Sequence, residues 1–144
     1  MNLDEKIINA LKDLDYKEAT EIQKKAIPIA LKKRDILAAA QSGTGKTAAF
    51  LLPILTELLA NKQVDKPILR ALILVPTREL ATQISKAVSD FSKYMEVESL
   101  AMVGGVSTKD QEKKIAKGLD ILVATSGRLM EHLKNGTVDL SSVT

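Results

Sequence analysis

A short segment with the sequence AQSGTGKT, residues 40–47, carries the residue types that bind phosphate groups. Its small residues allow successive backbone N–H groups to surround one anion, and they are Ser42, Gly43, Thr44 and Gly45. Lys46 would place a compact ammonium beside the β and γ phosphates, and Thr47 would offer its hydroxyl to Mg²⁺. The pattern predicts a site for a nucleoside triphosphate with Mg²⁺, although Ala40 replaces the usual first glycine. The alternative is an ordinary glycine-rich turn before a helix.

The segments around this loop alternate between helical and strand patterns. Apolar residues at helical spacing predict helices over residues 3–14 and 20–31, with Thr20 as the cap of the second. Residues 35–40, DILAAA, predict a short buried strand, and residues 46–59 predict a helix bent at Pro53. Further strands are predicted at 70–76, 97–103 and 120–125, the first of them fully buried, with helices at 77–95, 109–117 and 127–136. Continuous aliphatic strands between helices favour a doubly wound α/β fold with a parallel sheet.

Composition sets wide limits on function. The chain has 144 residues, of which 45% are apolar, and this favours one globular domain with its own core. A net charge of +3 permits a polyanionic partner without requiring one. No cysteine is present, no secretory signal is recognisable at the start, and no apolar stretch is long enough for a membrane span. We therefore expect a cytosolic protein, with a solvated loop at residues 61–67.

Five segments together resemble the first RecA-like lobe of DEAD-box RNA helicases, most closely a bacterial member. They are YKEATEIQ at 16–23, AQSGTGKT at 40–47, PTRELATQ at 76–83, GG at 104–105 and TSGR at 125–128. The resemblance covers the whole chain, with an adenine-sensing region at 1–31 and the phosphate-loop core at 32–144. It implies an open, mostly parallel sheet with helices on both faces. It also implies ATP and Mg²⁺ as cofactors and RNA unwinding as the activity of the parent protein, with Lys46 and Thr47 as catalytic residues.

The resemblance assigns adenine recognition to Gln23 and Tyr16. One amide donates and accepts hydrogen bonds at once, which matches the edge of adenine and not that of guanine. Tyr16 would lie against a base or anchor its own loop. The alternative is that Gln23 is only a polar residue on the second helix.

RNA contacts are implied for six residues that follow predicted strands: Thr77, Arg78, Gly105, Thr125, Gly127 and Arg128. Hydroxyls, guanidinium groups and glycine backbone suit phosphate and sugar contacts. The alternative makes Thr77 and Thr125 helix caps, the glycines turn residues and the arginines surface residues. The four aromatic residues form no cluster for base stacking, so we expect RNA to be held mostly by its sugar–phosphate backbone.

The catalytic carboxylates of the family are missing from the sequence. No run of four aliphatic residues precedes an Asp-Glu pair, and Asp120 precedes its strand, so it would lie at the opposite edge of the sheet. We expect a fragment that ends before the DEAD tetrapeptide, lacks the second RecA-like lobe as its partner, and does not hydrolyse ATP alone. Smaller departures from the family pattern are Ala19 for proline, Asp15 for glycine and Ser126 for proline.

Two features receive structural interpretations. His132 has no carboxylate or second histidine at ligand spacing, so we expect it to be structural. The segment 109–117, KDQEKKIAK, is interpreted as a solvated helix face. Two other functions remain open: a non-enzymatic interaction module, and a small-molecule kinase that uses the same phosphate loop.

Overall fold

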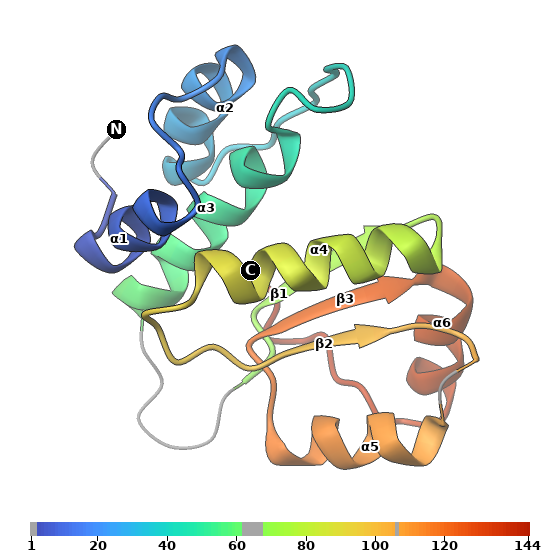
Figure 1. Ribbon diagram of the computed structural model, residues 1–144. Coiled ribbons are helices and arrows are strands. Elements are labelled where there is room, and N and C mark those ends of the chain that lie inside the picture. Colours follow the sequence, from blue (N-terminus) through green and yellow to red (C-terminus); the bar gives the residue numbers. More distant parts are fainter. Residues whose placement is uncertain (1–2, 62–67, 106) are drawn as a thin grey trace. The chain divides into compact units, whose positions relative to one another are not determined.

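The computed structural model describes residues 3–61, 68–105 and 107–144 (Figure 1). These residues form two compact units. The first contains residues 3–61 and Ser89–Glu96, and the second contains residues 68–88 and Val97–Thr144 without residue 106. Most of the predicted loop at 61–67 lies outside the described residues. Among the residues that are described, no helix has the length and apolar character of a membrane span.

The first unit is built from three helices: α1 (Glu5–Asp13), α2 (Glu21–Leu31) and α3 (Lys46–Ala60). The backbone N–H of Lys6 donates to the Asp4 carboxylate at 2.8 Å, which caps α1, and Thr20 is the N-cap of α2 as predicted. Helices α2 and α3 pack against each other. Fully buried aliphatic side chains from all three helices form the core, and they are Ile7, Ile27, Leu51 and Leu55.

The predicted strand at residues 35–40 is wrong. These residues belong to no strand of the structure, Ile36 is 42% exposed, and Leu37 is fully exposed. An apolar run becomes a strand only where a neighbour supplies hydrogen bonds and covers its side chains. Among the described residues, the three strands of the sheet pair with one another, and none of them pairs with residues 35–40.

The second unit contains a parallel sheet in the order β1-β3-β2, formed by β1 (Ala71–Val75), β3 (Ile121–Thr125) and β2 (Ser99–Met102). Ala71 and Ser99 both pair with Ile121, so the strands begin in register. Helix α4 (Arg78–Phe91) follows β1 and contributes residues 78–88 to this unit. Helix α5 (Thr108–Lys117) follows β2, and α6 (Ser126–Lys134) follows β3. The alternation of strands and helices is that of an α/β fold, as predicted.

Helices lie on both sides of this sheet, with α4 on one side and α5 and α6 on the other (Figure 1). The side of α5 and α6 has an apolar core of Leu100, Met102, Leu119, Leu122, Ala124, Leu129 and Val138. The central strand β3 is buried from Ile121 to Ala124, which explains its unbroken aliphatic sequence. The prediction that β1 is fully buried is wrong. This strand lies at the edge of the sheet, and its Leu74 is 58% exposed.

Candidate functional site

The phosphate-loop segment forms a tight turn that leads directly into α3 in the first unit. Gly43 and Gly45 have φ angles of 79° and 87°, in the left-handed region that glycine adopts most easily. The Thr44 hydroxyl donates to the Gln41 carbonyl and closes the turn. Within the described chain, the backbone N–H groups of residues 42–47 donate to no protein acceptor. The loop therefore keeps several donors for a bound anion.

Gln23 holds this loop from α2. Its amide nitrogen donates to the Gly45 carbonyl at 3.2 Å, and its amide oxygen accepts from the Thr20 backbone N–H at 3.0 Å. A Cβ on Gly45 would lie 2.4 Å from the same amide nitrogen and 2.8 Å from the Thr20 hydroxyl oxygen. A side chain at this position would therefore be strained by the backbone angle and would force Gln23 and Thr20 to move. The amide retains one donor and one acceptor for a ligand.

Lys46 and Thr47 form the first turn of α3, where the positive end of the helix dipole favours an anion. Lys46 is exposed and Thr47 is partly buried. The described residues contain no cluster of three or more His, Cys, Asp or Glu side chains that could hold a metal ion. The donors fit a phosphate chain, and for Mg²⁺ the hydroxyl of Thr47 suits an ion that keeps waters and phosphate oxygens as its other ligands.

Tyr16 lies in the turn between α1 and α2. Its ring packs against Phe91, with the ring centroids 5.8 Å apart, and the side chain remains 51% exposed. The contact with Phe91 is compatible with the anchoring alternative, and the exposed part of the ring leaves contact with a base as a prediction.

The candidate RNA residues of the second unit gather where its three strands end. Thr77 and Arg78 follow β1, Gly105 follows β2, and Thr125 ends β3. Because the strands are parallel and in register, these ends lie at the same edge of the sheet. This is the usual ligand edge of an open α/β sheet.

Arg78 connects the first two of these loops. Its guanidinium donates to the Gly104 carbonyl at 3.2 Å. Gly105 has a φ angle of 83°, and a Cβ there would lie 2.4 Å from the Arg78 Nη1 atom. Arg78 has further N–H donors, so this contact leaves part of the guanidinium for a phosphate.

The threonines at this edge differ in their local role. The Thr77 hydroxyl accepts from the backbone N–H of Leu80 at 3.2 Å, so the alternative role of a helix cap is realised there. Thr125 precedes α6 without a side-chain capping bond. The backbone of Gly127 is not in the left-handed region, and a Cβ at Gly127 would meet no atom within 4 Å. Neither the backbone angle nor the space around Gly127 therefore requires glycine at that position.

Arg128 is tied to its own helix. Its Nε atom lies 3.2 Å from the Glu131 carboxylate, and only 14% of its side chain is exposed. The nearby carboxylate reduces the positive charge that Arg128 presents at this edge.

Asp120 lies at the other edge of the sheet, as predicted. Its carboxylate accepts from the backbone N–H of Glu98 at 2.9 Å. Burial raises the pKa of Asp120 above its ordinary value, and the hydrogen bond from Glu98 opposes this only in part. Because Asp120 precedes β3 and the candidate RNA residues follow the strands, the length of the strands separates them.

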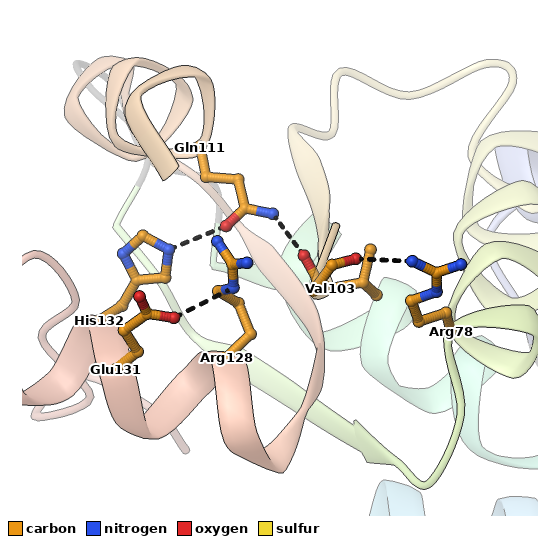
Figure 2. A network of polar contacts seen from close by, with 7 residues as sticks. Arg78, Val103, Gln111, Arg128, Glu131 and His132 are labelled. Carbon is orange, nitrogen blue, oxygen red and sulfur yellow. Dashed lines mark hydrogen bonds and ion pairs between the residues drawn. The ribbon is translucent and has the colours of Figure 1, made fainter. Parts of the chain in front are cut away.

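A buried polar network near the loop after β2, at the end of the sheet that carries the candidate RNA residues, was not predicted (Figure 2). His132 and Gln111 are almost completely buried and bonded to each other, which agrees with a structural role for His132. The prediction of a solvated face at 109–117 was wrong for Gln111. Its spacing from Ile115 and Leu119, four and eight residues later, was the available signal for an inward-facing position.

Comparisons with known proteins agree with this geometry. The family model for DEAD/DEAH box helicases matches residues 20–144. The chain is 46% identical over 138 residues to ATP-dependent RNA helicase DeaD of Escherichia coli, covering 95% of this chain and 21% of that protein. It is 44% identical over 135 residues to probable ATP-dependent RNA helicase ddx27 of Dictyostelium discoideum, covering 94% and 17%. A hypothetical ATP-dependent RNA helicase from Sulfolobus tokodaii superposes with a TM-score of 0.86 at 36% identity, over 98% of this chain and 39% of that one.

Proposed function

Because this chain belongs to the DEAD/DEAH box helicase family, we propose that it is the ATP-binding and RNA-backbone-binding lobe of an RNA helicase. The chain spans about a fifth of the length of the curated relatives DeaD and ddx27. The activity of the whole protein is then to couple ATP binding and hydrolysis to unwinding or remodelling of RNA. In that protein a second RecA-like lobe would close on this one around ATP and RNA.

The nucleotide half of the proposal is supported by the loop at residues 42–47. Its unbonded N–H groups and the start of α3 would hold the phosphates, and Lys46 would neutralise the outer two. Thr47 would hold Mg²⁺, which when bound offsets the negative charge of the phosphate chain. Gln23 would bind adenine through the donor and acceptor that its contacts with Gly45 and Thr20 leave over. We expect the chain alone to bind ATP without RNA-stimulated turnover.

The RNA half is supported by the common edge at which three parallel strands end. Thr77, Arg78 and Gly105 would contact the sugar–phosphate backbone from the ends of β1 and β2. Thr125, Gly127 and Arg128 would do so from the end of β3 and the start of α6. Such contacts carry little sequence information and depend strongly on salt.

The observation that carries the proposal most strongly is the contact of Gln23 with Gly45. It joins the residue expected to recognise adenine to the loop expected to hold phosphates, through one hydrogen bond of 3.2 Å. Competition against a fluorescent ATP analogue tests it, with Mg²⁺ present. ATP should displace the analogue at a concentration at least about tenfold below that of GTP, since guanine mismatches the amide of Gln23.

Binding of labelled single-stranded RNA tests the other half. Fluorescence anisotropy should give similar affinities for uridine and adenosine oligomers, and a linear loss of affinity with the logarithm of salt concentration. Arg78→Ala should weaken binding by roughly tenfold. Two results would favour the rival functions: a pocket for a small phosphate acceptor points to a kinase, and a protein partner indifferent to nucleotide points to an interaction module.

A further inference from the structure

A directional chain of hydrogen bonds runs through the interior of the second unit and ends on the loop after β2 (Figure 2). His132 on α6 is 0% exposed, and Gln111 on α5 is 1% exposed. The His132 Nε2 atom lies 2.9 Å from the Gln111 amide oxygen. The Gln111 amide nitrogen donates to the Val103 carbonyl at 3.1 Å.

These contacts fix where the proton of His132 lies. Because the Gln111 nitrogen faces the Val103 carbonyl, its oxygen must face His132 and accept a hydrogen bond. The His132 Nε2 atom therefore carries a proton and donates it. The other ring nitrogen, Nδ1, is buried and has no partner among the described residues. The ring thus contributes one hydrogen bond, and that bond orients Gln111.

The loop that receives this chain is held at two successive carbonyl groups. Gln111 binds the carbonyl of Val103, and Arg78 binds the carbonyl of Gly104 at 3.2 Å. In a planar trans peptide the N–H group points opposite to the carbonyl of the preceding residue. The N–H of Gly104 is therefore directed away from Gln111, and the N–H of Gly105 away from Arg78. In the described part of the chain neither N–H donates to an acceptor.

We propose that Gln111 and His132 are positioning residues for RNA binding: they orient the peptide groups of residues 103–105 without touching RNA. The inference rests on the proposed function, because it assigns the N–H groups of Gly104 and Gly105 to RNA phosphate oxygens. A buried pair of polar side chains costs stability unless both are bonded, and here their last bond is to this loop. Gln111 acts directly on Val103, and His132 acts through Gln111.

The test compares four variants with the unchanged 144-residue chain. Gln111→Met and His132→Leu remove the hydrogen bonds, and His132→Gln keeps a donor that can reach Gln111. Gln83→Met is the matched control, because Gln83 is an exposed glutamine on α4. Three quantities are measured: affinity for a fluorescein-labelled uridine oligomer, affinity for a fluorescent ATP analogue, and the ¹H–¹⁵N signals of Gly104 and Gly105.

Gln111→Met and His132→Leu should bind the oligomer roughly tenfold more weakly, as expected for loss of one hydrogen bond to a charged oxygen. His132→Gln should recover most of this affinity, and Gln83→Met should match the unchanged chain. Affinity for the ATP analogue should be the same in all variants. In Gln111→Met the signals of Gly104 and Gly105 should shift or broaden more than that of Gly118 at the end of α5.

Two results would overturn the inference. One is unchanged affinity for the oligomer in folded Gln111→Met, while the unchanged chain binds it. The other is unaltered glycine signals in that variant. If the unchanged chain binds no RNA at all, the proposed function fails. The glycine signals then still decide whether Gln111 orients the loop, because they need no RNA.

Discussion

Replacement of Gly45 by alanine tests how the phosphate loop is held. The Gly45 backbone has a φ angle of 87°, and a residue with a side chain pays about 1–2 kcal/mol for that region. The new Cβ would lie 2.4 Å from the Gln23 amide nitrogen, so the hydrogen bond to the Gly45 carbonyl must break. An unpaired buried amide costs about 1–3 kcal/mol more. Gly45→Ala should therefore lower the free energy of unfolding by about 2–5 kcal/mol.

Gly43→Ala is the matched control. Gly43 has a φ angle of 79°, but a Cβ there would meet no atom within 4 Å. Gly43→Ala should lose only the part of the stability that comes from the backbone angle, so the free energies of unfolding of the two variants should differ by about 1–3 kcal/mol. Placing Gly45→Ala in a Gln23→Ala background should lower its cost toward that of Gly43→Ala, because the contact with Gln23 is gone and only the Thr20 hydroxyl, 2.8 Å from the new Cβ, remains close.

Tyrosine fluorescence during urea unfolding is a suitable assay. The chain has no tryptophan and two tyrosines, Tyr16 and Tyr94, and both belong to the first unit with Gly45. The signal therefore follows the unit that carries the substitution. Equal costs for Gly45→Ala and Gly43→Ala, or a cost that Gln23→Ala leaves unchanged, would refute the reasoning.

Three further predictions concern single positions. Asp15→Gly should stabilise the first unit by about 0.5–1 kcal/mol in urea unfolding, because Asp15 directly follows the C-cap of α1, Leu14, with a φ angle of 59°; destabilisation would contradict it. Gly127→Ala should raise helix stability by up to about 1 kcal/mol yet weaken RNA binding severalfold, since only a close RNA backbone would need glycine there; unchanged RNA affinity would count against the contact. The raised pKa of Asp120 means that the folded state holds this proton more tightly than the unfolded state does, so its charge costs stability as the pH rises above about 3.8. In urea unfolding, the free energy of unfolding of Asp120→Asn should therefore rise relative to that of the unchanged chain between about pH 3 and pH 6. A difference in free energy of unfolding that stays constant over this range would exclude the effect.

The local elements were predictable because their signals lie in adjacent residues. The helix that begins after Thr20 and the turn before Lys46 each follow from a few neighbouring side chains. The common edge of Thr77, Gly105 and Thr125 followed from the alternation of strands and helices.

Pairing and burial were less predictable because they depend on distant partners. Residues 35–40 have the composition of a buried strand, yet nothing in that segment alone says whether a neighbouring strand will cover it. Leu74 belongs to the same kind of aliphatic run as β3, but β1 is an edge strand and β3 is central. The bond of Gln111 to Val103 depends on the packing of α5 against β2, and charged neighbours in the sequence hide it.

The most direct test of the central claim is a titration of the ¹⁵N-labelled chain with ATP and Mg²⁺. We predict that the amide signals of residues 42–47 move in a saturable way, that the same ligand leaves Lys46→Ala unaffected, and that both proteins keep the dispersed spectrum of a folded chain. Signals at 42–47 that stay unmoved at millimolar ATP, in a chain that is demonstrably folded, would contradict the assignment of this loop to a nucleotide.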